Sequence, residues 1–303
     1  MNSRSLLSLL ILCSLCPLWL SSASAQKEAK APAGGVKHIY KTVGDLKLPL
    51  YLYAPIARKS TGQAPAIVFF FGGGWKNGSP AQFEEHCKFL AQRGMAAITV
   101  EYRVSSRHNV KVEDCIADAR SAMRWVRGNA KKLGVDPNRI ASGGGSAGGH
   151  LAAAVALMDS FDSKTDDLKV SAQPNAMVLF NPAMAIAPHK DLPAACNEQF
   201  KTRLSDRSRG PVEKVSPFQY ATRKQPPCIM FFGTADALLV GAEAYRKASV
   251  AAGNKCEIIT YKGQGHGFFN AHRSAGKYLQ LTMAEMDNFL ISLGWLKPRD
   301  GGG

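Results

Sequence analysis

A serine lies between glycines in the segment Gly144-Gly145-Ser146-Ala147-Gly148. This spacing fits the G-x-S-x-G pattern, in which a sharp turn between a strand and a helix projects a serine hydroxyl above a sheet. The glycines have a steric purpose, because a Cβ would obstruct so tight a turn and the close packing of the following helix. We expect a short strand at 139–142 and an alanine-rich helix at 147–158 on the two sides. The pattern therefore predicts Ser146 as a nucleophile.

A serine hydroxyl needs a base, and the base needs an orienting carboxylate, before the serine can attack at neutral pH. Above a parallel sheet these groups are expected on loops after later strands, in the chain order Ser, Asp or Glu, His. Asp236 follows an expected strand at 228–232, and His266 follows one at 256–261. Both loops open at the same sheet edge as the serine. We predict that Ser146 attacks, His266 accepts the proton and Asp236 holds the imidazolium.

The other histidines and the acids of one irregular segment fit these roles less well. His150 lies four residues after Ser146 on the same expected helix, and we interpret it as structural. Asp191 and Asp206 fall in the irregular segment, where solvation or lid contacts are the simpler interpretation. The remaining histidines do not follow a strand end in the required order: His38, His86, His108, His189 and His272.

A second glycine cluster, Phe71-Gly72-Gly73-Gly74-Trp75, follows an expected buried strand at 66–71. Residues without side chains let backbone N–H groups approach a reacting carbonyl, so we predict an oxyanion hole formed by Gly73, Gly74 and the N–H of Ala147. A phosphate loop is the alternative, but no lysine stands in the required register. Trp75 and Phe268 are predicted to line the substrate pocket, with core packing as the alternative for Trp75. No metal site is predicted.

Strands and helices alternate along the elements that must position these residues. Two β-prone runs, 37–43 and 46–53, flank Gly44-Asp45 and predict a hairpin. Further strands are expected at 66–71, 96–102, 139–142, 176–180, 228–232 and 256–261, and helices at 80–93, 112–132, 147–158, 241–252 and 277–293. This alternation predicts an α/β fold with a mainly parallel sheet, antiparallel at its start, covered by helices on both faces.

The ends of the chain and one internal segment stand apart from this pattern. Residues 1–25 combine Arg4, an apolar stretch and Ala23-Ser24-Ala25, which predicts a cleaved secretory signal and export rather than a stable membrane anchor. Residues 26–35 are interpreted as a linker, 36–297 as the catalytic domain and 298–303 as a flexible tail. The proline-rich stretch 182–227 is predicted to form a lid or pocket wall, with a surface excursion as the alternative.

The chain of 303 residues is strongly basic, with a formal net charge of +15. Its basic residues are scattered and no RNA-binding aromatic signature accompanies them, so no nucleic-acid partner is predicted. The plainer interpretation is a basic exported protein, and attraction to an acidic polysaccharide or cell-envelope polymer is the alternative.

Cysteine usage does not predict a disulfide framework. Cleavage after Ala25 would leave an odd number of cysteines at irregular spacing: Cys87, Cys115, Cys196, Cys228 and Cys256. We expect Cys87, Cys115 and Cys228 in the core. Cys196 and Cys256 could pair.

In combination, these motifs resemble the α/β-hydrolases of the hormone-sensitive-lipase-like and acetylxylan/feruloyl-esterase-like branches. The resemblance implies an α/β-hydrolase fold, no cofactor and ester hydrolysis through an acyl-enzyme, and it supports Ser146, Asp236 and His266 in their roles. Glycine at 145 favours the acetylxylan/feruloyl side. The matching segments are 72–75, Glu101-Tyr102-Arg103, Asp136-Pro137-Asn138-Arg139-Ile140, 145–150, Gly233-Thr234-Ala235-Asp236 and His266-Gly267-Phe268.

The chain departs from these relatives at one position. Related sequences usually have histidine where this chain has Phe71, and that histidine braces the glycine loop by hydrogen bonding. The substitution leaves the N–H donors in place but raises the question of how the loop is held.

The sequence thus predicts an exported serine esterase that removes small acyl groups, acetyl or feruloyl, from a carbohydrate or a related ester. One alternative is a peptidase, amidase or formamidase, because the same three residues also attack amides. A second is a carbohydrate- or partner-binding protein that keeps the fold without catalysis. The oligomeric state stays open.

Overall fold

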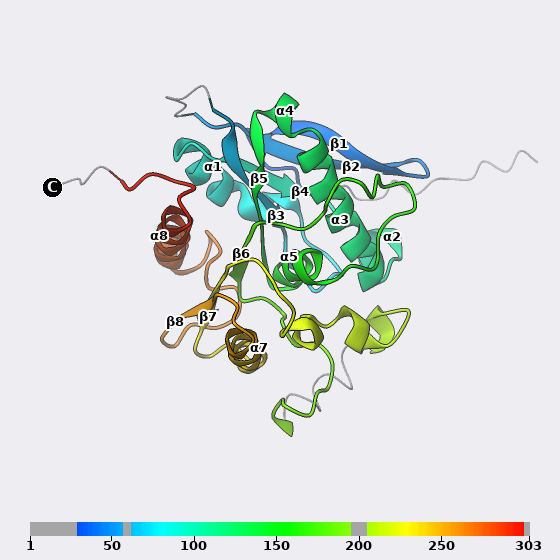
Figure 1. The fold of residues 1–303 in the computed structure, drawn as a ribbon, viewed down its shortest axis with the longest axis vertical. Coiled ribbons are helices and arrows are strands. Elements are labelled where there is room, and N and C mark those ends of the chain that lie inside the picture. Colours follow the sequence, from blue (N-terminus) through cyan, green and yellow to red (C-terminus); the bar gives the residue numbers. More distant parts are fainter. Residues whose placement is uncertain (1–28, 57–61, 195–204, 300–303) are drawn as a thin grey trace, which may run out of the picture.

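The computed structural model describes residues 29–56, 62–194 and 205–299. The strands of these residues form one eight-stranded sheet in the order β1-β2-β4-β3-β5-β6-β7-β8 (Figure 1). β1 pairs with β2, and β2 with β4, in antiparallel fashion, and the other neighbours are parallel. The predicted fold class is confirmed. The strands are β1 (Val36–Val43), β2 (Leu46–Tyr53), β3 (Ala64–Phe70), β4 (Ala96–Val100), β5 (Val135–Gly145), β6 (Ala176–Phe180), β7 (Cys228–Gly233) and β8 (Cys256–Tyr261).

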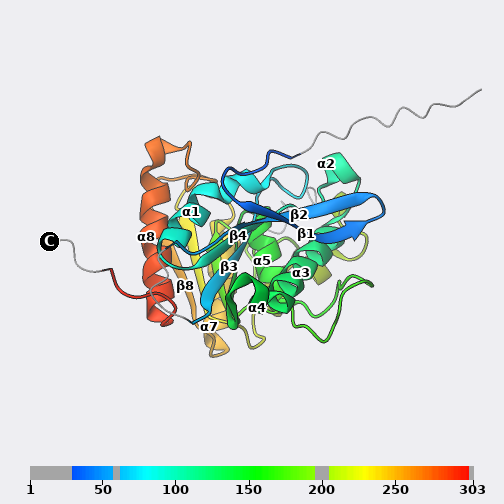
Figure 2. The same ribbon diagram turned by 90° about the horizontal axis from the view of Figure 1, so that it is seen from above.

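Helices cover both faces of this sheet (Figure 2). Helices α1 (Glu84–Gln92) and α8 (Lys277–Ser292) pack on one face. Helices α3 (Val112–Gly128), α5 (Ala147–Leu157) and α7 (Leu239–Ala251) pack on the other. The short elements are η1 (Pro80–Phe83), α2 (Ser105–His108), α4 (Ala130–Leu133), η2 (Ser205–Arg207), η3 (Val212–Val215), η4 (Pro217–Tyr220) and η5 (Ser274–Gly276).

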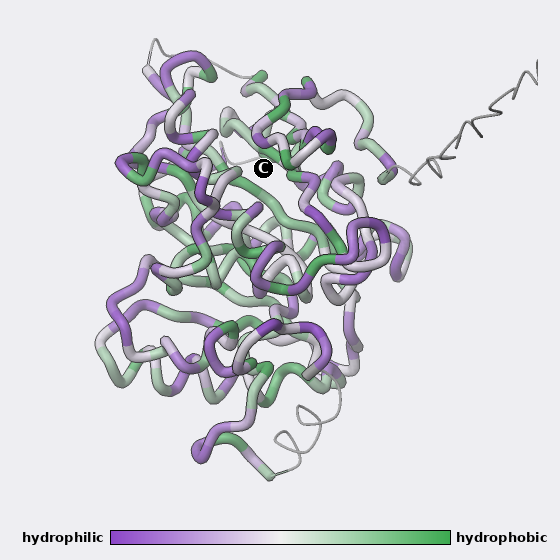
Figure 3. Tube along the Cα trace, turned by 90° about the vertical axis from the view of Figure 1, so that its right-hand side faces the viewer, coloured by the Kyte–Doolittle hydropathy of each residue, from purple (hydrophilic) through white to green (hydrophobic). Residues whose placement is uncertain are grey.

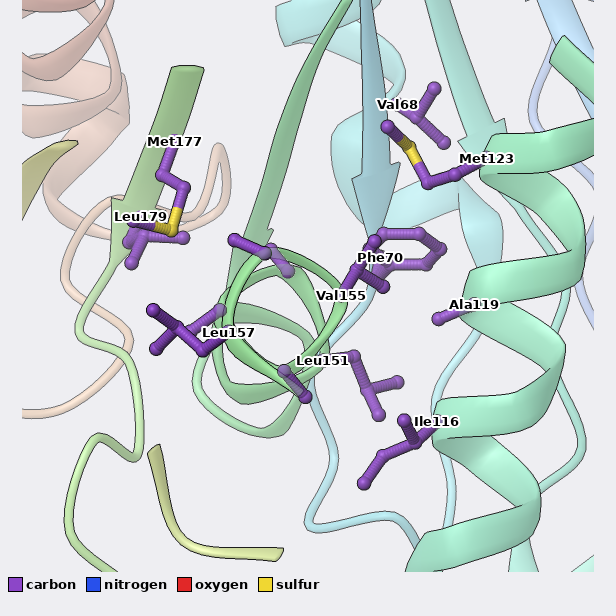
Figure 4. Close-up of a cluster of buried hydrophobic side chains, with 14 of the residues drawn as sticks. Val68, Phe70, Ile116, Ala119, Met123, Leu151, Val155, Leu157, Met177 and Leu179 are labelled. Atoms are coloured by element: carbon purple, nitrogen blue, oxygen red, sulfur yellow. The ribbon is translucent and has the colours of Figure 1, made fainter. Parts of the chain in front are cut away.

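Strand β3 illustrates how the side chains of one strand are buried on both faces of the sheet. All seven of its residues are buried, and their alternation sends Ile67 and Phe69 to the α1/α8 side and Val68 and Phe70 to the other. Phe70 lies between Val155 of α5 and Ala119 of α3 (Figure 4). Hydrophobic segments accordingly run through the interior of the molecule (Figure 3). This core fixes the strand ends that carry the chemistry.

Three elements differ from their predicted limits by more than two residues. The helix predicted at 80–93 begins with the 3-10 turn η1, which has a proline in its first turn, before α1. The helix predicted at 112–132 is interrupted at Asn129, whose Nδ2 donates a hydrogen bond to the Trp125 carbonyl at 2.8 Å. Strand β5 begins at Val135, four residues before the predicted strand at 139–142, because Val135 pairs with Ala64 of β3.

The cysteine predictions are confirmed where the structure describes them. Cys87, Cys115 and Cys228 are buried in the core. Cys256 is a buried free thiol opposite Cys228 on the neighbouring strand, and its suggested partner Cys196 lies outside the described residues. The predicted signal segment 1–25 also lies outside them. No helix of the described residues is long and apolar enough to span a bilayer.

Candidate active site

Ser146 occupies the turn between β5 and α5, at the carboxyl edge of the sheet. Its backbone has φ 54° and ψ −117°, a conformation that costs energy for a residue with a side chain. The neighbouring glycines make the turn possible. A Cβ on Gly148 would lie 1.9 Å from the Phe70 carbonyl oxygen, and one on Gly144 would lie 2.4 Å from the Gly148 oxygen. The Ser146 N–H donates to the Phe180 carbonyl of β6 at 2.9 Å, which ties the turn to the next strand.

The structure brings the three side chains of the predicted triad into one hydrogen-bonded row. His266 Nε2 lies 2.8 Å from Ser146 Oγ, and His266 Nδ1 lies 2.8 Å from Asp236 Oδ2. A carboxylate can only accept, so Nδ1–H donates to Asp236 and the lone pair on Nε2 accepts the serine proton. Asp236 is 5% exposed, whereas the His266 side chain is 44% exposed. The imidazole is therefore partly open to solvent.

The loops that follow β7 and β8 are packed directly on each other. A Cβ on Gly233 would lie 2.0 Å from the Gln264 carbonyl oxygen, and that oxygen accepts a hydrogen bond from the N–H of Ala235 at 3.0 Å. Next to the imidazole, the Gly267 N–H donates to Asn181 Oδ1 at 3.2 Å. Asn181 follows β6 with φ 37°, and sequence reasoning did not identify it as a site residue. An asparagine directly after a strand was the signal, because asparagine tolerates this left-handed region better than most residues.

The predicted oxyanion donors lie beside the nucleophile. A Cβ on Gly72 would meet the Gly145 carbonyl oxygen at 2.9 Å and Ser146 Cβ at 3.3 Å, so the glycine loop touches the nucleophile turn. Gly73 and Gly74 have φ values of 126° and 63°. Among the described residues, none accepts a hydrogen bond from the N–H groups of Gly73, Gly74 or Ala147. Ala147 begins α5, where the helix N-terminus leaves N–H groups free.

The glycine loop is held without the histidine of related sequences. The ring of Phe71 stacks on Tyr102 with 4.1 Å between ring centroids, and the Tyr102 hydroxyl donates to the Phe71 carbonyl at 2.7 Å. The Gly72 N–H donates to Gln82 Oε1 at 2.6 Å. Sequence reasoning identified neither Tyr102 nor Gln82 as a support of this loop.

Trp75 and Phe268, which are predicted to line the substrate pocket, are both buried. Trp75 is 6% exposed and packs in the core, where its Nε1–H donates to His150 Nδ1 at 3.2 Å. Phe268 is 4% exposed and packs against Tyr261 and Tyr278 on the α1/α8 side of the sheet. Both side chains thus pack among core residues, the alternative considered for Trp75, and their role in the pocket stays a prediction.

His150 has the structural position expected of it. The ring is fully buried, and its Nε2–H donates to the Val215 carbonyl at 2.6 Å, while Nδ1 accepts from Trp75. Burial lowers the pKa of His150 to about 4, so the ring is neutral at ordinary pH. His150 thereby connects the nucleophile helix with the glycine loop and with the irregular segment.

The irregular segment lies close to these loops in its described parts, 182–194 and 205–227. The η4 turn packs on α5 and α7 (Figure 1). Arg207 Nη1 donates to the Gly74 carbonyl at 2.9 Å, and Ser208 Oγ donates to Glu113 at 2.6 Å. This segment therefore contacts the glycine loop at Gly74. Across residues 29–56, 62–194 and 205–299, no three His, Cys, Asp or Glu side chains are arranged to hold a metal ion.

The chain is similar to one family model and to several solved structures. The BD-FAE model matches residues 50–246. The apo form of Thermogutta terrifontis esterase 2 is 43% identical, with a TM-score of 0.81 over 89% of this chain and 98% of that chain. The butyrate-bound form is 42% identical, with a TM-score of 0.81 over 88% and 97% of the two chains. Other structures of that esterase hold propionate or are phosphorylated by paraoxon.

Curated relatives are more distant. An arylesterase of Saccharolobus solfataricus is 32% identical over 150 residues, which is 49% of this chain and 46% of the relative. Esterase LipC of Mycobacterium tuberculosis is 28% identical over 219 residues, which is 69% of this chain and 54% of the relative. The chain thus spans about half the length of these curated relatives.

Proposed function

The chain belongs to the BD-FAE family and is an α/β-hydrolase of the esterase type, and we propose that it hydrolyses carboxylic esters with Ser146, His266 and Asp236 as its catalytic residues. The observation that carries this proposal is the pair of 2.8 Å contacts that join the three side chains in the order hydroxyl, imidazole, carboxylate. This order is the one that nucleophilic acyl transfer requires.

In the proposed reaction, Ser146 Oγ attacks the ester carbonyl carbon while its proton passes to His266 Nε2. Asp236 stabilises the imidazolium that forms. The carbonyl oxygen gains negative charge and accepts hydrogen bonds from the N–H groups of Gly73, Gly74 and Ala147. The bond to the alcohol then breaks, and His266 returns the proton to the leaving oxygen. Water, activated by the same imidazole, releases the acid from Ser146.

For the substrate, we propose esters of small acyl groups on a carbohydrate or a similar alcohol. The propionate- and butyrate-bound structures of Thermogutta terrifontis esterase 2 support a short acyl chain. The contact of Arg207 with the Gly74 carbonyl supports the irregular segment as a wall of the site, as predicted. Export is part of the proposal and depends on the signal features of residues 1–25. N-terminal sequencing of the exported protein tests it, and we expect a start at Gln26.

The decisive experiment compares the wild type with Ser146→Ala on nitrophenyl esters from acetate to longer chains. We expect the variant to lose roughly four to six orders of magnitude in kcat, the loss typical of a removed triad nucleophile. Ser171→Ala, in an exposed position ahead of β6, is the control and keeps full activity. Paraoxon is expected to inactivate the wild type and to modify Ser146.

Two outcomes contradict the proposal. One is near-normal hydrolysis of nitrophenyl acetate by Ser146→Ala. The other is a paraoxon adduct that peptide mapping finds on a residue other than Ser146. Nitroanilides tested beside the esters separate an esterase from an amidase, and we expect the esters to react far faster.

A further inference from the structure

The peptide group between Phe71 and Gly72 is held from two sides. Its carbonyl accepts a hydrogen bond from the Tyr102 hydroxyl at 2.7 Å, and its N–H donates to Gln82 Oε1 at 2.6 Å. A peptide group is planar, so contacts on its carbonyl and on its N–H together fix its rotation about the chain. The next two peptide groups carry the N–H groups of Gly73 and Gly74. The orientation of the first peptide therefore sets the starting direction of both proposed oxyanion donors.

The other end of the Gln82 amide leads to the loop of the catalytic imidazole. Gln82 Nε2 donates to Asn270 Oδ1 at 2.9 Å. Asn270 Nδ2 and its backbone N–H both donate to the Gly267 carbonyl, at 2.8 and 3.2 Å. Gly267 directly follows His266. One chain of hydrogen bonds thus runs from the glycine loop through two side-chain amides to the residue beside His266.

The direction of this chain follows from its two ends. A backbone N–H can only donate, so the Gln82 atom facing Gly72 is the oxygen, and its nitrogen must face Asn270. A carbonyl can only accept, so Asn270 presents its nitrogen to Gly267 and its oxygen to Gln82. Both ends demand the same orientation of the two amides. The neutral amide of Gln82 supplies both groups that the chain needs at this point, an acceptor for the Gly72 N–H and a donor to Asn270 Oδ1.

We propose that Gln82 is a positioning residue that holds the oxyanion donors in register with His266, a role that rests on the function proposed above. The glycine loop has no side chains of its own between Phe71 and Trp75, and glycine restricts the backbone least. Oxyanion donors must meet charge that develops only in the transition state, and small displacements weaken them strongly. Gln82 is itself fixed in η1, between the buried residues Pro80 and Phe83.

Replacing Gln82 by methionine keeps the length of the side chain and removes both hydrogen bonds. We expect kcat per active site to fall about ten- to a hundredfold, less than the 10²–10³ lost with an oxyanion donor itself. KM should stay within about threefold, because the ground-state ester makes little use of these donors. The rate constant for inactivation by paraoxon should fall in parallel with kcat. Gln280→Met, on an exposed position of α8, is the matched control and changes neither constant.

A double-mutant cycle tests the bridge from its other end. Asn270→Ala should reduce kcat in the same way, and Gln82→Met/Asn270→Ala should be no more than two- to threefold worse than the more damaged single variant, because both break one connection. Active sites are counted by fluorophosphonate labelling and melting temperatures are recorded, so a partly unfolded variant is not mistaken for a slow one.

Three results overturn the inference: a kcat of Gln82→Met within twofold of the wild type, losses that multiply in the double variant, or a rise in KM with kcat unchanged. Ser146→Ala, assayed alongside, separates this inference from the proposed function. If Ser146→Ala is inactive and Gln82→Met is normal, only the positioning role fails. If Ser146→Ala is active, the proposed function fails as well.

Discussion

His86 of α1 is buried without a hydrogen-bond partner, and its removal should stabilise the protein, most of all in acid. The residue is 1% exposed and lies among Phe69, Phe83, Phe180 and Phe269, with ring centroids 5.0–6.0 Å apart. Within the described part of the chain, neither ring nitrogen has a hydrogen-bond partner. Burial lowers the pKa of His86 from 6.5 to about 3.

The pH dependence follows from the number of protons bound by each state. Between pH 6.5 and about 3, the unfolded chain carries a proton on His86 that the folded protein does not bind. The free energy of unfolding therefore falls as the pH falls, by about 1.4 kcal/mol per pH unit for one such group. At pH 5, His86 costs the folded state about 2 kcal/mol relative to pH 8. His150, with its pKa lowered to about 4, adds a cost of the same sign.

The variant His86→Leu removes the free-energy cost of His86 and leaves that of His150. At pH 8 we expect a gain of about 1–3 kcal/mol from the two ring nitrogens that no longer need partners. At pH 5 the gain should be larger by about 2 kcal/mol, which corresponds to a further rise of roughly 4–8 °C in Tm. Thermal and urea unfolding of both proteins at pH 8, 6.5 and 5 measure these differences. His272→Leu, at an exposed position, is the control for the same substitution outside the core. A gain that is equal at pH 8 and pH 5, or a wild type more stable than the variant, refutes the reasoning.

Two further predictions concern the site itself. Trp75→Phe removes the donor to His150 Nδ1 and should lower the free energy of unfolding, measured with urea, by about 1–2 kcal/mol. The preference for acyl chain length on nitrophenyl esters should stay unchanged, and a changed preference would show that Trp75 lines the pocket. Gly148→Ala places a Cβ 1.9 Å from the Phe70 oxygen and should abolish folding or activity, measured by circular dichroism and esterase assay, whereas Gly128→Ala meets no atom within 4 Å and should be neutral or stabilising by up to about 1 kcal/mol.

Much of the fold could be predicted from periodicity and turn chemistry. The strands at 176–180 and 256–261 have their predicted limits, because each is a short β-prone run with turn residues on both sides. The start of β5 could not be predicted, because Val135 becomes a strand residue only through its pairing with Ala64. Local turn signals cannot report such a pairing between residues far apart in the chain.

The residues of the site also divide into those that a sequence pattern predicts and those that depend on contacts between distant parts of the chain. The positions of Ser146, Asp236 and His266 follow from a topological rule, since the carboxyl ends of parallel strands meet at one edge. The supports of these residues follow no such rule. Gln82 and Asn270 are 188 residues apart, and nothing in the neighbourhood of either predicts their contact. Which way Trp75 and Phe268 point was equally hidden, because an aromatic residue beside a catalytic loop can face either the substrate or the core.

Apart from Arg207, whose guanidinium donates to the Gly74 carbonyl, the side chains that hold the catalytic loops are neutral. Asn181, Gln82 and Asn270 hold the loops with amides, and the Thr234 hydroxyl accepts from the Gly263 N–H at 2.8 Å. A unit charge about 8 Å from the reacting oxygen would change its energy by about 2 kcal/mol at an effective dielectric constant of about 20. A carboxylate in such a position would oppose the developing oxyanion, and a cation would oppose the imidazolium. Neutral amides orient both loops, and Asp236 is the charged group that directly contacts His266.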